Sequence, residues 1–568
     1  MNQTKTVIYG SGRYPRDFLY IFKDIKVDYY IDDIESNGVS SYKRLTRENN
    51  VYVIICKYDE QTASENLQKL GLKKGKDFVS ATTYFEKLDF PIKEISKSRN
   101  VYVWGTGERS HEFFHAYVEK NPDIEICGCV DSNKEKSGKN FFKRKVFLPE
   151  EVIFNDNSFF VIASTDYYEE IKKTLIDAGK KEMQDFVHYM HINNHASWMA
   201  RETIFDMPKL DYVCPKAFHD AALMSEGRLS VCTAVRNVVN WNISFMYADF
   251  ADVWKSNIMR ILRLSMINGT YTFCDKQKCD LLRNCGNCLW DTNDIHYKFH
   301  KTPEEFEFMK KKHIVPIDTV FNQSNYEIEV LDYPDVLMCS YDRSCNLHCK
   351  SCRENIFFAQ GKCKQSLFKF SDKIKQEVFP HINYIKVAGD GETFASEVYR
   401  DIIFDKSTGA NIKNIGILSN GSLLNKDNLD KLISLYENIK VFISMDGASK
   451  KTAEKLRRGI NFDSWEENMQ VLGHMRKLGK VNFLAFNFVV QKENYREMPA
   501  FAKMCLEQYN ADAVKFSPLL NWGSFSNEEF EKESMFDICG IMKPELKEVV
   551  ADEIFSNEKV FLFEWVNW

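Results

Sequence analysis

The stretch Cys345-Asn-Leu-His-Cys349-Lys-Ser-Cys352 follows an apolar, strand-like run that ends at Ser340. Its cysteine spacing puts three thiols on one side of a tight loop or helical turn. Three thiolates hold a [4Fe–4S] cluster and leave one iron without a protein ligand, so that iron is open to an outside ligand. The alternative is three core cysteines on the apolar face of a helix. Asn346, Lys350 and Ser351 make a poor apolar face, which favours the cluster.

The composition is that of a globular protein with several domains. The chain has 568 residues, of which 44% are hydrophobic and 28% are charged, and its net charge is −5. This charge gives no reason to expect a nucleic acid or a membrane surface as a partner. No apolar run reaches the length of a membrane span, and the first residues lead into a strand instead of a signal peptide. We therefore expect a cytoplasmic protein.

Cysteine usage points to metal clusters instead of disulfide bonds. Ten of the 16 cysteines lie between residues 214 and 352, mostly at the short spacings of metal ligands. An intracellular chain keeps its thiols reduced, which agrees with this interpretation.

The C-x3-C-x2-C motif resembles that of the radical S-adenosylmethionine (SAM) superfamily. The resemblance implies that the open iron chelates the amino and carboxylate groups of SAM, and that the reduced cluster cleaves SAM to a 5′-deoxyadenosyl radical. It also implies a partial (β/α)6 barrel over residues 330–525, with the cluster at its mouth. Apolar strands alternate with amphipathic helices in this range, as a parallel sheet with helical crossovers requires.

Further elements follow the cysteines in the order that the superfamily has. The turn Gly389-Asp-Gly391-Glu392 resembles its Gly-Gly-Glu-Pro element, with Thr393 for the proline, and Ser419-Asn420-Gly421 resembles its Thr-Asn-Gly turn. A serine and an arginine that follow the next strand hold the SAM carboxylate in relatives. Ser351 stands where many members have an aromatic residue against the adenine. The implied SAM-binding residues are Gly391, Glu392, Asn420, Ser444 and Arg457.

A second group of cysteines, in residues 205–295, precedes the first. It is interrupted by a predicted amphipathic helix from Asp252 to Arg263. It consists of Cys214, Cys232, Cys274, Cys279, Cys285 and Cys288. We expect one [4Fe–4S] cluster on the first four, with the last two as alternates or as members of a second site. The alternative is a structural zinc ion held by four cysteines.

This second group resembles the SPASM domain, which carries auxiliary Fe–S clusters in many radical SAM enzymes. Two features depart from that pattern. The segment precedes the SAM domain instead of following it, and its later spacing is C-x4-C-x5-C-x2-C.

The first two hundred residues are a repeat of two units, 1–95 and 96–195. Each runs from a strand through Gly-x-Gly and a helix to a strand that ends in aspartate, as in a Rossmann-like β-α-β unit. The candidate nucleotide-binding residues are Gly10, Gly12 and Asp32 in the first unit and Gly105, Gly107 and Asp131 in the second. Pro15 and Ser110 replace the third glycine of the fingerprint. Each unit is therefore either a nucleotide or nucleotide-sugar site, or a degenerate scaffold or docking module.

The sequence thus predicts an α/β protein: two small Rossmann-like units, a SPASM-like segment, a partial barrel and a helix-rich closing segment over 526–568. The resemblance implies hydrogen abstraction, with SAM and a flavodoxin or ferredoxin as partners, leading to oxidation, epimerisation or rearrangement. A sugar, nucleotide-sugar or related small metabolite is the favoured substrate, because the second unit resembles modules attached to enzymes of polysaccharide and nucleotide-sugar pathways. The alternatives are a peptide-modifying SPASM-type maturase and a non-catalytic Fe–S sensor.

Overall fold

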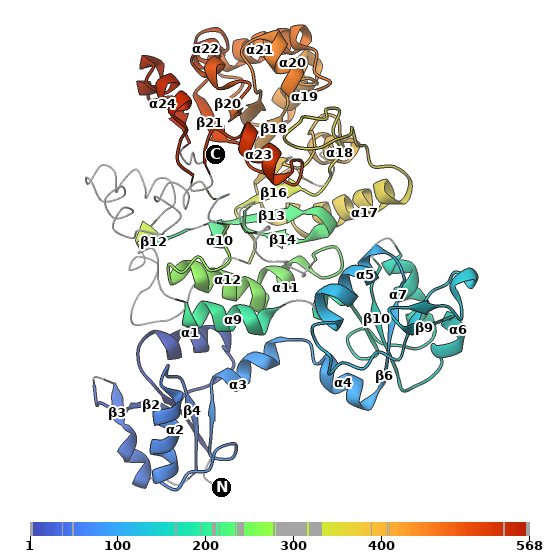
Figure 1. Cartoon of the computed structure of the whole chain (residues 1–568), viewed down its shortest axis with the longest axis vertical. Coiled ribbons are helices and arrows are strands. Elements are labelled where there is room, and N and C mark those ends of the chain that lie inside the picture. The colour runs from blue at the N-terminus through green and yellow to red at the C-terminus, as the bar shows by residue number, and fades with distance from the viewer. Residues whose placement is uncertain are drawn as a thin grey trace.

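The computed structural model has four parts along the chain: two small α/β units, a helical middle segment and a large sheet with its helices (Figure 1). The structure describes residues 4–36, 38–47, 50–164, 167–192, 195–206, 212–214, 216–232, 235, 244–275, 279, 315–316, 332–387, 389–405, 407, 409–537 and 540–563. Cys285 and Cys288, expected as alternate cluster ligands, lie outside the described residues.

The first unit is a five-stranded sheet in the order β3-β2-β1-β4-β5, with every neighbouring pair parallel. Its elements are β1 (Lys5–Tyr9), α1 (Arg13–Ile21), β2 (Tyr29–Asp32), β3 (Val39–Ser41), β4 (Val51–Ile55), α2 (Glu60–Lys69), β5 (Phe78–Ser80) and α3 (Thr82–Phe85). The strands are short apolar runs separated by polar helices, which is the pattern that forms parallel sheets with helical crossovers.

The second unit repeats this arrangement with a six-stranded sheet in the order β11-β10-β6-β7-β9-β8. Only the pair β8–β9 is antiparallel. Its elements are α4 (Ile92–Ser98), β6 (Asn100–Trp104), α5 (Glu108–Phe113), β7 (Gly128–Val130), β8 (Asn140–Phe141), β9 (Arg144–Phe147), α6 (Pro149–Val152), β10 (Ser158–Ile162), α7 (Tyr168–Asp177), β11 (Phe186–His188) and α8 (Tyr189–Ile192).

The middle segment is mainly helical. Its elements are α9 (Ala196–Phe205), β12 (Tyr212–Val213), α10 (Lys216–His219), β13 (Asp220–Met224), β14 (Leu229–Ser230), α11 (Phe250–Trp254), α12 (Asn257–Ile267) and β15 (Val315–Pro316). The prediction of one helix from Asp252 to Arg263 was wrong, because the chain forms α11 and α12 separately. The side chain of Ser256 accepts a hydrogen bond from the amide of Met259 and so starts a new helix.

The large sheet has nine strands in the order β14-β13-β16-β17-β18-β19-β20-β21-β22, and only β13–β14 is antiparallel. Its strands after β14 are β16 (Val336–Ser340), β17 (Tyr384–Val387), β18 (Asn414–Ser419), β19 (Asn438–Ser444), β20 (Phe483–Val490), β21 (Ala513–Pro518) and β22 (Val560–Leu562). Its helices are α17 (Gly361–Glu377), α18 (Glu397–Phe404), α19 (Lys426–Leu435), α20 (Lys450–Leu456), α21 (Phe462–Lys477), α22 (Met498–Lys503), α23 (Asn527–Glu533) and α24 (Pro544–Val549). The mixed α/β class with mainly parallel sheets agrees with the sequence prediction.

Both edges of this sheet extend beyond the six strands that the sequence predicts. β13, from the cysteine-rich segment, pairs in parallel with β16, from Asp220 opposite Val336 to Met224 opposite Ser340. β22, from the segment expected to be helical, pairs in parallel with β21. The cysteine-rich segment is therefore joined to the large sheet by backbone hydrogen bonds.

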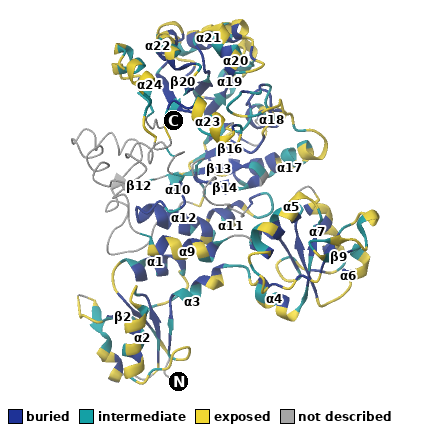
Figure 2. Cartoon of the chain, viewed as in Figure 1, coloured by how far each residue is buried: buried dark blue, intermediate teal, exposed yellow. Residues whose placement is uncertain are grey.

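One apolar core runs from α1 through the middle helices into the large sheet, and includes Phe18, Trp254 and Val441. Polar contacts seal the junction with the first unit: Nη2 of Arg13 donates to the carbonyl of Ile204 at 2.9 Å, and Nδ2 of Asn268 donates to buried Asp17 at 2.7 Å. Figure 2 shows buried residues on both the sheet and the middle helices.

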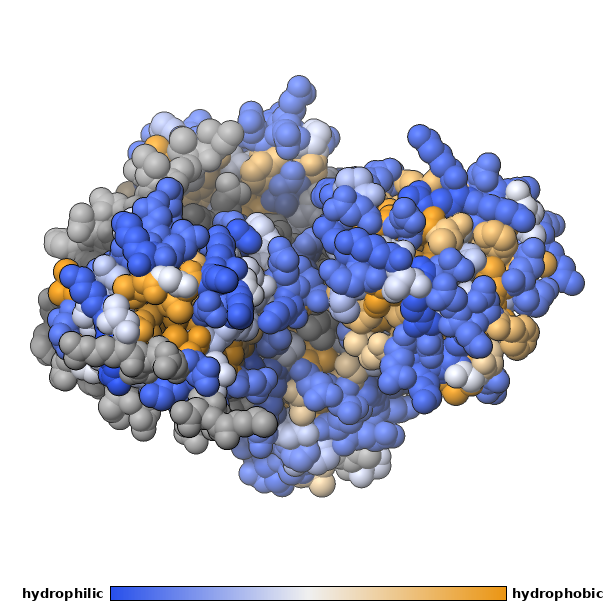
Figure 3. All heavy atoms as spheres, turned by 90° about the horizontal axis from the view of Figure 1, so that it is seen from below, coloured by the Kyte–Doolittle hydropathy of each residue, from blue (hydrophilic) through white to orange (hydrophobic). Residues whose placement is uncertain are grey.

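The outer surface is mainly hydrophilic in the view of Figure 3, with apolar residues gathered in smaller areas. Among the described residues, no helix is both long and apolar enough to cross a membrane.

His188 gives the second unit a dependence on pH. Its ring is buried among the rings of Tyr168, Tyr189 and Tyr247, and Tyr247 belongs to the middle segment. Burial, together with the charge of nearby His191, lowers the pKa of His188 from 6.5 to about 3. Below about pH 6.5 the unfolded chain therefore binds a proton at His188 that the folded chain does not bind. The stability that is present above that pH is lost on acidification.

We predict that lowering the pH from about 7.5 to about 5.5 reduces the free energy of unfolding of the wild type by about 1.4 kcal/mol more than that of His188→Leu. The difference arises because only the wild type contains this buried histidine. Thermal unfolding midpoints of both proteins at the two pH values measure the difference. His115→Leu is the matched control, because His115 is exposed in the same unit. Equal losses of stability in the wild type and His188→Leu would contradict the prediction.

Candidate functional site

The three cysteines of the C-x3-C-x2-C motif lie in a loop at the carboxyl end of β16. The amide of Cys345 donates to the carbonyl of Phe357 at 2.7 Å, and the amide of Cys352 donates to the carbonyl of Cys349 at 3.0 Å. The charges of Cys345 and Cys352 both act on the Cys349 thiol. The loop is therefore closed by backbone hydrogen bonds and brings the three sulfur atoms near one another.

Two arginines flank these thiols. Burial raises the pKa of Cys349 to about 11 and also raises the pKa of Cys345. The charge of Arg457 opposes the shift at Cys349, and the charge of Arg353 opposes it at Cys345. Metal ligation requires thiolates, so cations beside the loop favour the form of cysteine that binds metal.

Arg353, which follows the last cysteine, is held in place by backbone carbonyls. It donates from Nη1 to the carbonyl of Arg343 at 2.5 Å and from Nη2 to the carbonyl of Asp390. It thereby connects the two ends of the cysteine loop to the turn after β17.

A buried acid fixes the segment that leads into the cysteine loop. The carboxylate of Asp342, which is 1% exposed, accepts hydrogen bonds from the amide and hydroxyl of Ser344 at 2.9 and 2.8 Å. It also accepts one from the hydroxyl of Ser396 at 2.5 Å, and Ser396 begins α18. Asp342 thus fixes the segment between β16 and Cys345 against the next helix of the sheet.

The turn after β17 is pressed against the same segment. The amide of Glu392 donates to the carbonyl of Ser344 at 2.8 Å. A Cβ atom added at Gly391 would lie 2.4 Å from the carbonyl oxygen of Asp342 and 2.8 Å from that of Ser344. Only glycine fits there, so the need for Gly391 follows directly from the packing of two backbone segments.

Glu392 links the ends of two strands. Its buried carboxylate accepts hydrogen bonds from the hydroxyl of Ser419 and the amide of Asn420, both at 2.6 Å. Burial raises the pKa of Glu392, although these bonds and the charge of Arg457 oppose the shift. In the structure this acid ties the turn after β17 to the turn after β18. Its expected contact with the SAM amino group stays a prediction.

Asn420 continues the link to the cysteine loop. Its Nδ2 donates to Oδ1 of Asn346 at 3.1 Å, and its Oδ1 accepts from the hydroxyl of Ser422 at 2.6 Å. The turns after three successive strands are therefore joined by polar side chains.

Arg457 lies after α20, next to the cysteine loop. Its Nε is 2.7 Å from Oδ2 of Asp446, which is 1% exposed. Burial disfavours the charge of Arg457, but Asp446 and Cys349 together raise its pKa. Within the described part of the chain no hydrogen bond engages its Nη atoms, and its side chain is 13% exposed. Ser444 ends β19 and is partly buried, two residues before Asp446.

The structure thus brings Gly391, Glu392, Asn420 and Arg457 around the cysteine loop. Three residues that the sequence analysis missed support this site: Asp342, Arg353 and Asp446. Two of them had a signal in the sequence, because Asp342 and Arg353 lie within three residues of a motif cysteine. Charged residues so close to cysteines in a strand–loop junction are candidates for holding the loop.

The structure also brings together four cysteines of the second group. The charges of Cys214, Cys232 and Cys279 all act on Cys274, although burial is the main reason that its pKa is raised. Burial likewise raises the pKa of Cys214 to about 12. These four are the residues expected to hold one auxiliary cluster.

The glycine turns of the two α/β units follow β1 and β6, the strands on either side of which the order of addition changes: β2 and β7 lie on one side, β4 and β10 on the other. A Cβ at Gly10 would meet the carbonyl oxygen of Cys56 at 2.2 Å, and one at Gly105 would meet that of Ala163 at 2.8 Å. Each glycine therefore lets the turn after the first strand of its unit approach the end of a neighbouring strand. Asp32 and Asp131 end the second strand or follow it directly.

One family model matches part of the chain. The model described as C2185-like, N-terminal, matches residues 97–184, which lie in the second unit. No curated protein matches the sequence.

Several solved structures are similar to part of the chain. SuiB of Streptococcus suis bound to precursor peptide SuiA is 16% identical over 46% of this chain and 53% of that one, with a TM-score of 0.28. Native anSMEcpe with bound AdoMet and Cp18Cys peptide is 18% identical over 40% and 62%, with a TM-score of 0.29. A radical SAM methyltransferase from Sphaerobacter thermophilus is 14% identical over 40% and 64%, with a TM-score of 0.23. The chain spans 53% to 64% of the length of these three structures.

We predict that Gly391→Ala lowers the thermal unfolding midpoint, because the new methyl group enters a space filled by backbone. Overpacking of this kind costs about 1–3 kcal/mol. Gly107→Ala is the matched control: Gly107 has an ordinary φ of −99°, and a Cβ there meets nothing within 4 Å. Equal midpoints for the two variants would contradict the packing argument.

Proposed function

We propose that this chain is a radical SAM enzyme. The proposal rests on the loop of Cys345, Cys349 and Cys352, which is pinned at the carboxyl ends of parallel strands and flanked by Arg353 and Arg457. When bound, a [4Fe–4S] cluster and SAM supply a 5′-deoxyadenosyl radical that takes a hydrogen atom from the substrate.

The thiols suit a cluster better than a single ion. In the described ranges, no three histidine, cysteine, aspartate or glutamate side chains group closely enough to hold one metal ion. A [4Fe–4S] cluster spreads its thiolate ligands over its own width, and three of them leave the fourth iron open. At Cys214, Cys232, Cys274 and Cys279 we propose an auxiliary cluster, with a structural zinc ion as the alternative.

The surroundings of the loop suit SAM. Gly391 exposes backbone beside the cysteine loop, where a bulkier residue has no room. The Nη atoms of Arg457, which have no hydrogen-bond partner among the described residues, would be the donors for the SAM carboxylate, since a planar guanidinium binds carboxylates through two parallel hydrogen bonds. Ser444 and Asn420 are the other residues that we assign to SAM, and Glu392 positions the turn that carries Asn420.

We interpret β16 to β21 as a partial (β/α)6 barrel and the first two sheets as Rossmann-like units. The six strands are parallel and consecutive, and the two smaller sheets share one order of parallel strands at their centre. Under this interpretation the cysteine loop lies at the carboxyl ends of the barrel strands, where βα loops carry chemistry.

The substrate class that we propose is a sugar, nucleotide-sugar or related small metabolite. The second unit supports it, because its glycine turn and Asp131 are of the kind that binds nucleotides. A flavodoxin or ferredoxin is the proposed electron donor. Cys214, Cys232, Cys274 and Cys279 would hold an auxiliary cluster, which would supply an electron acceptor for net oxidation of the substrate. Epimerisation or rearrangement would leave the oxidation state of the substrate unchanged.

We predict that changing Cys345, Cys349 and Cys352 together to alanine abolishes 5′-deoxyadenosine formation from SAM under dithionite. The reconstituted variant should also lose about four iron atoms per chain, since one cluster has lost its ligands. Cys127→Ser is the control, because Cys127 is an exposed thiol in the second unit. Chromatography of the products and iron analysis measure both effects.

Two outcomes would overturn the proposal. Wild-type rates in the triple variant would show that these cysteines do not hold the reactive cluster. Binding of SAM by the wild type without any cleavage would favour the Fe–S sensor instead.

We also predict that Arg457→Lys weakens SAM binding about tenfold or more, because lysine keeps the charge but lacks the two-pronged donor. Lysine keeps a positive charge beside Asp446, so folding should be preserved. Equilibrium binding of SAM to the reconstituted protein measures the effect. The adjacent exposed Arg458, changed to lysine, is the matched control, and equal affinities for both variants would remove Arg457 from the SAM site.

A further inference from the structure

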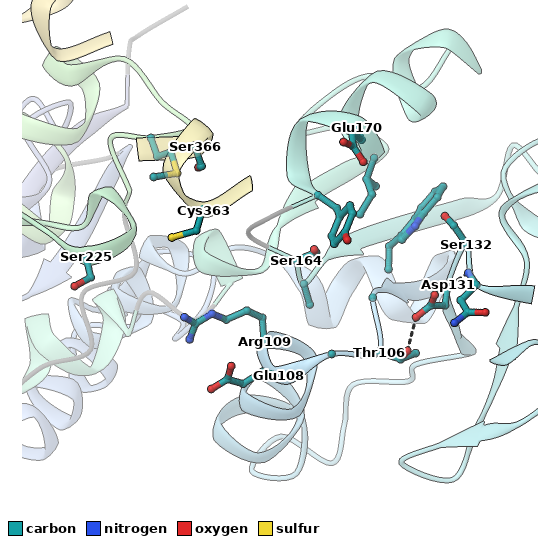
Figure 4. A pocket seen from close by; sticks show the side chains of 18 of the residues that line it. Thr106, Glu108, Arg109, Asp131, Ser132, Ser164, Glu170, Ser225, Cys363 and Ser366 are labelled. Atoms are coloured by element: carbon teal, nitrogen blue, oxygen red, sulfur yellow. Dashed lines mark hydrogen bonds between the residues drawn. The ribbon is translucent and has the colours of Figure 1, made fainter. Parts of the chain in front are cut away.

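A pocket of about 970 Å³ lies between the second unit and the large sheet, and Figure 4 shows it from close by. One wall is the turn Gly105–Gly107 with Asp131, from the second unit. The opposite wall includes Tyr341 and Arg343, from the segment between β16 and the cysteine loop. A ligand in this pocket would therefore touch both the glycine turn and the segment that leads to Cys345.

Specific contacts hold the two walls together. Nζ of Lys362, in the first turn of α17, lies 4.0 Å from the ring centre of Tyr167 and 3.4 Å from Oε1 of Glu170. At the side of the middle segment, the ring of Tyr247 packs 4.4 Å from that of Tyr168. The pocket is thus bordered by contacts between parts of the chain that are far apart in sequence.

The glycine turn presents backbone to this pocket. Gly105 has a φ of +118°, and its lack of a side chain lets the turn approach Ala163 at the end of β10. Gly107 differs, because its φ is ordinary and a Cβ there would meet no protein atom within 4 Å. The protein's own packing does not require glycine at 107, whereas close approach of a ligand to the backbone does.

Asp131 is a charged acceptor beside this turn. It accepts hydrogen bonds from the hydroxyl of Thr106, the amide of Asn133 at 2.9 Å and Nζ of Lys136 at 3.0 Å. Burial works against its charge, but these donors keep the pKa of Asp131 below its ordinary value. A carboxylate in this position after the second strand is suited to the hydroxyls of a ribose.

The pocket also has charge and aromatic surface for the rest of a nucleotide. Arg109 and Lys136 lie near the turn, where Arg109 pairs with Glu112 and Lys136 pairs with Asp131, both at 3.0 Å. In Figure 4 Arg109 extends from α5 toward the side that carries Ser225 and Cys363. Phe357 lines the pocket with 43% of its surface exposed, and its carbonyl accepts from the amide of Cys345. An exposed ring next to the cysteine loop is a platform on which a base or sugar can stack.

We propose that this pocket binds a substrate linked to a nucleoside diphosphate. The nucleotide lies on Gly105–Gly107 and Asp131, and the linked group extends toward Phe357 and the cysteine loop. The volume suits such a ligand, since small-molecule pockets span about 300–1,000 Å³. The proposed binding of the nucleotide does not depend on the radical SAM function. The orientation of the linked group toward the cysteine loop rests on that proposed function.

The first unit provides a matched contrast. Its Asp32 has the same place in the sequence pattern and is held by a similar pair of donors, Lys57 and the hydroxyl of Ser11, both at 2.5 Å. Among the described residues, none before Trp104 lines the pocket. Asp32→Asn therefore changes the corresponding acid without touching the proposed site.

Calorimetric titration of the reconstituted chain with ADP, GDP, CDP, UDP and dTDP tests the proposal. We expect at least one to bind with a Kd of about 100 µM or lower. Gly107→Val and Asp131→Asn should each weaken that binding about tenfold or more, while Asp32→Asn should stay within about twofold. Thermal unfolding midpoints of the variants show whether they are folded. Gly107→Val should remain folded, because a Cβ at this position meets no protein atom within 4 Å, although valine is a poorer N-cap residue for α5 than glycine.

Three results would overturn the proposal: no diphosphate binds at millimolar concentration, NAD⁺ binds and the diphosphates do not, or Asp131→Asn and Gly107→Val bind like the wild type. Cleavage of SAM by the wild type without nucleotide is measured separately. If SAM is cleaved but no nucleotide binds, only this inference falls. If a nucleotide binds but SAM is never cleaved, the proposed radical chemistry falls and the nucleotide site stands.

Discussion

The close approach of two backbone segments at the carboxyl end of the large sheet is the constraint on which the candidate site depends. The turn after β17 meets the segment before Cys345 with no room for a side chain at Gly391. Asp342 holds that segment from one side, and Glu392 joins the turn to β18 from the other. The cysteine loop is therefore attached to rigid strands, and a group held by its thiols would have a fixed position relative to its neighbours.

Charge balance is the second condition of this site. Buried thiolates are costly unless cations lie beside them, and Arg353 and Arg457 supply those cations from two different elements. Arg457 is itself balanced by buried Asp446. Removing any one of these charges leaves another without a partner, so the arginines, the acid and the cysteines act as one electrostatic unit.

Local patterns in the sequence predicted much of the architecture but not its long-range connections. Gly-x-Gly turns, apolar strands and cysteine spacings are local, and they located the glycines, the strands β16 to β21 and the four cysteines that lie near one another. The pairing of β13 with β16 joins segments more than one hundred residues apart, and no local pattern encodes it. Likewise, Asp446 could not be recognised as the partner of Arg457 until the turn after β19 was placed beside α20.

The two α/β units show how one pattern takes different roles through its surroundings. In the first, a lysine from the turn after β4 pairs with Asp32, and the helix α1 is packed against the middle segment. In the second, Lys136 pairs with Asp131 in the same way, but the equivalent end of the sheet faces α17 and the segment that leads to Cys345 across a pocket. The shared pattern therefore does not determine what lies opposite the end of the sheet. Segments far away in the sequence decide whether that end borders a pocket.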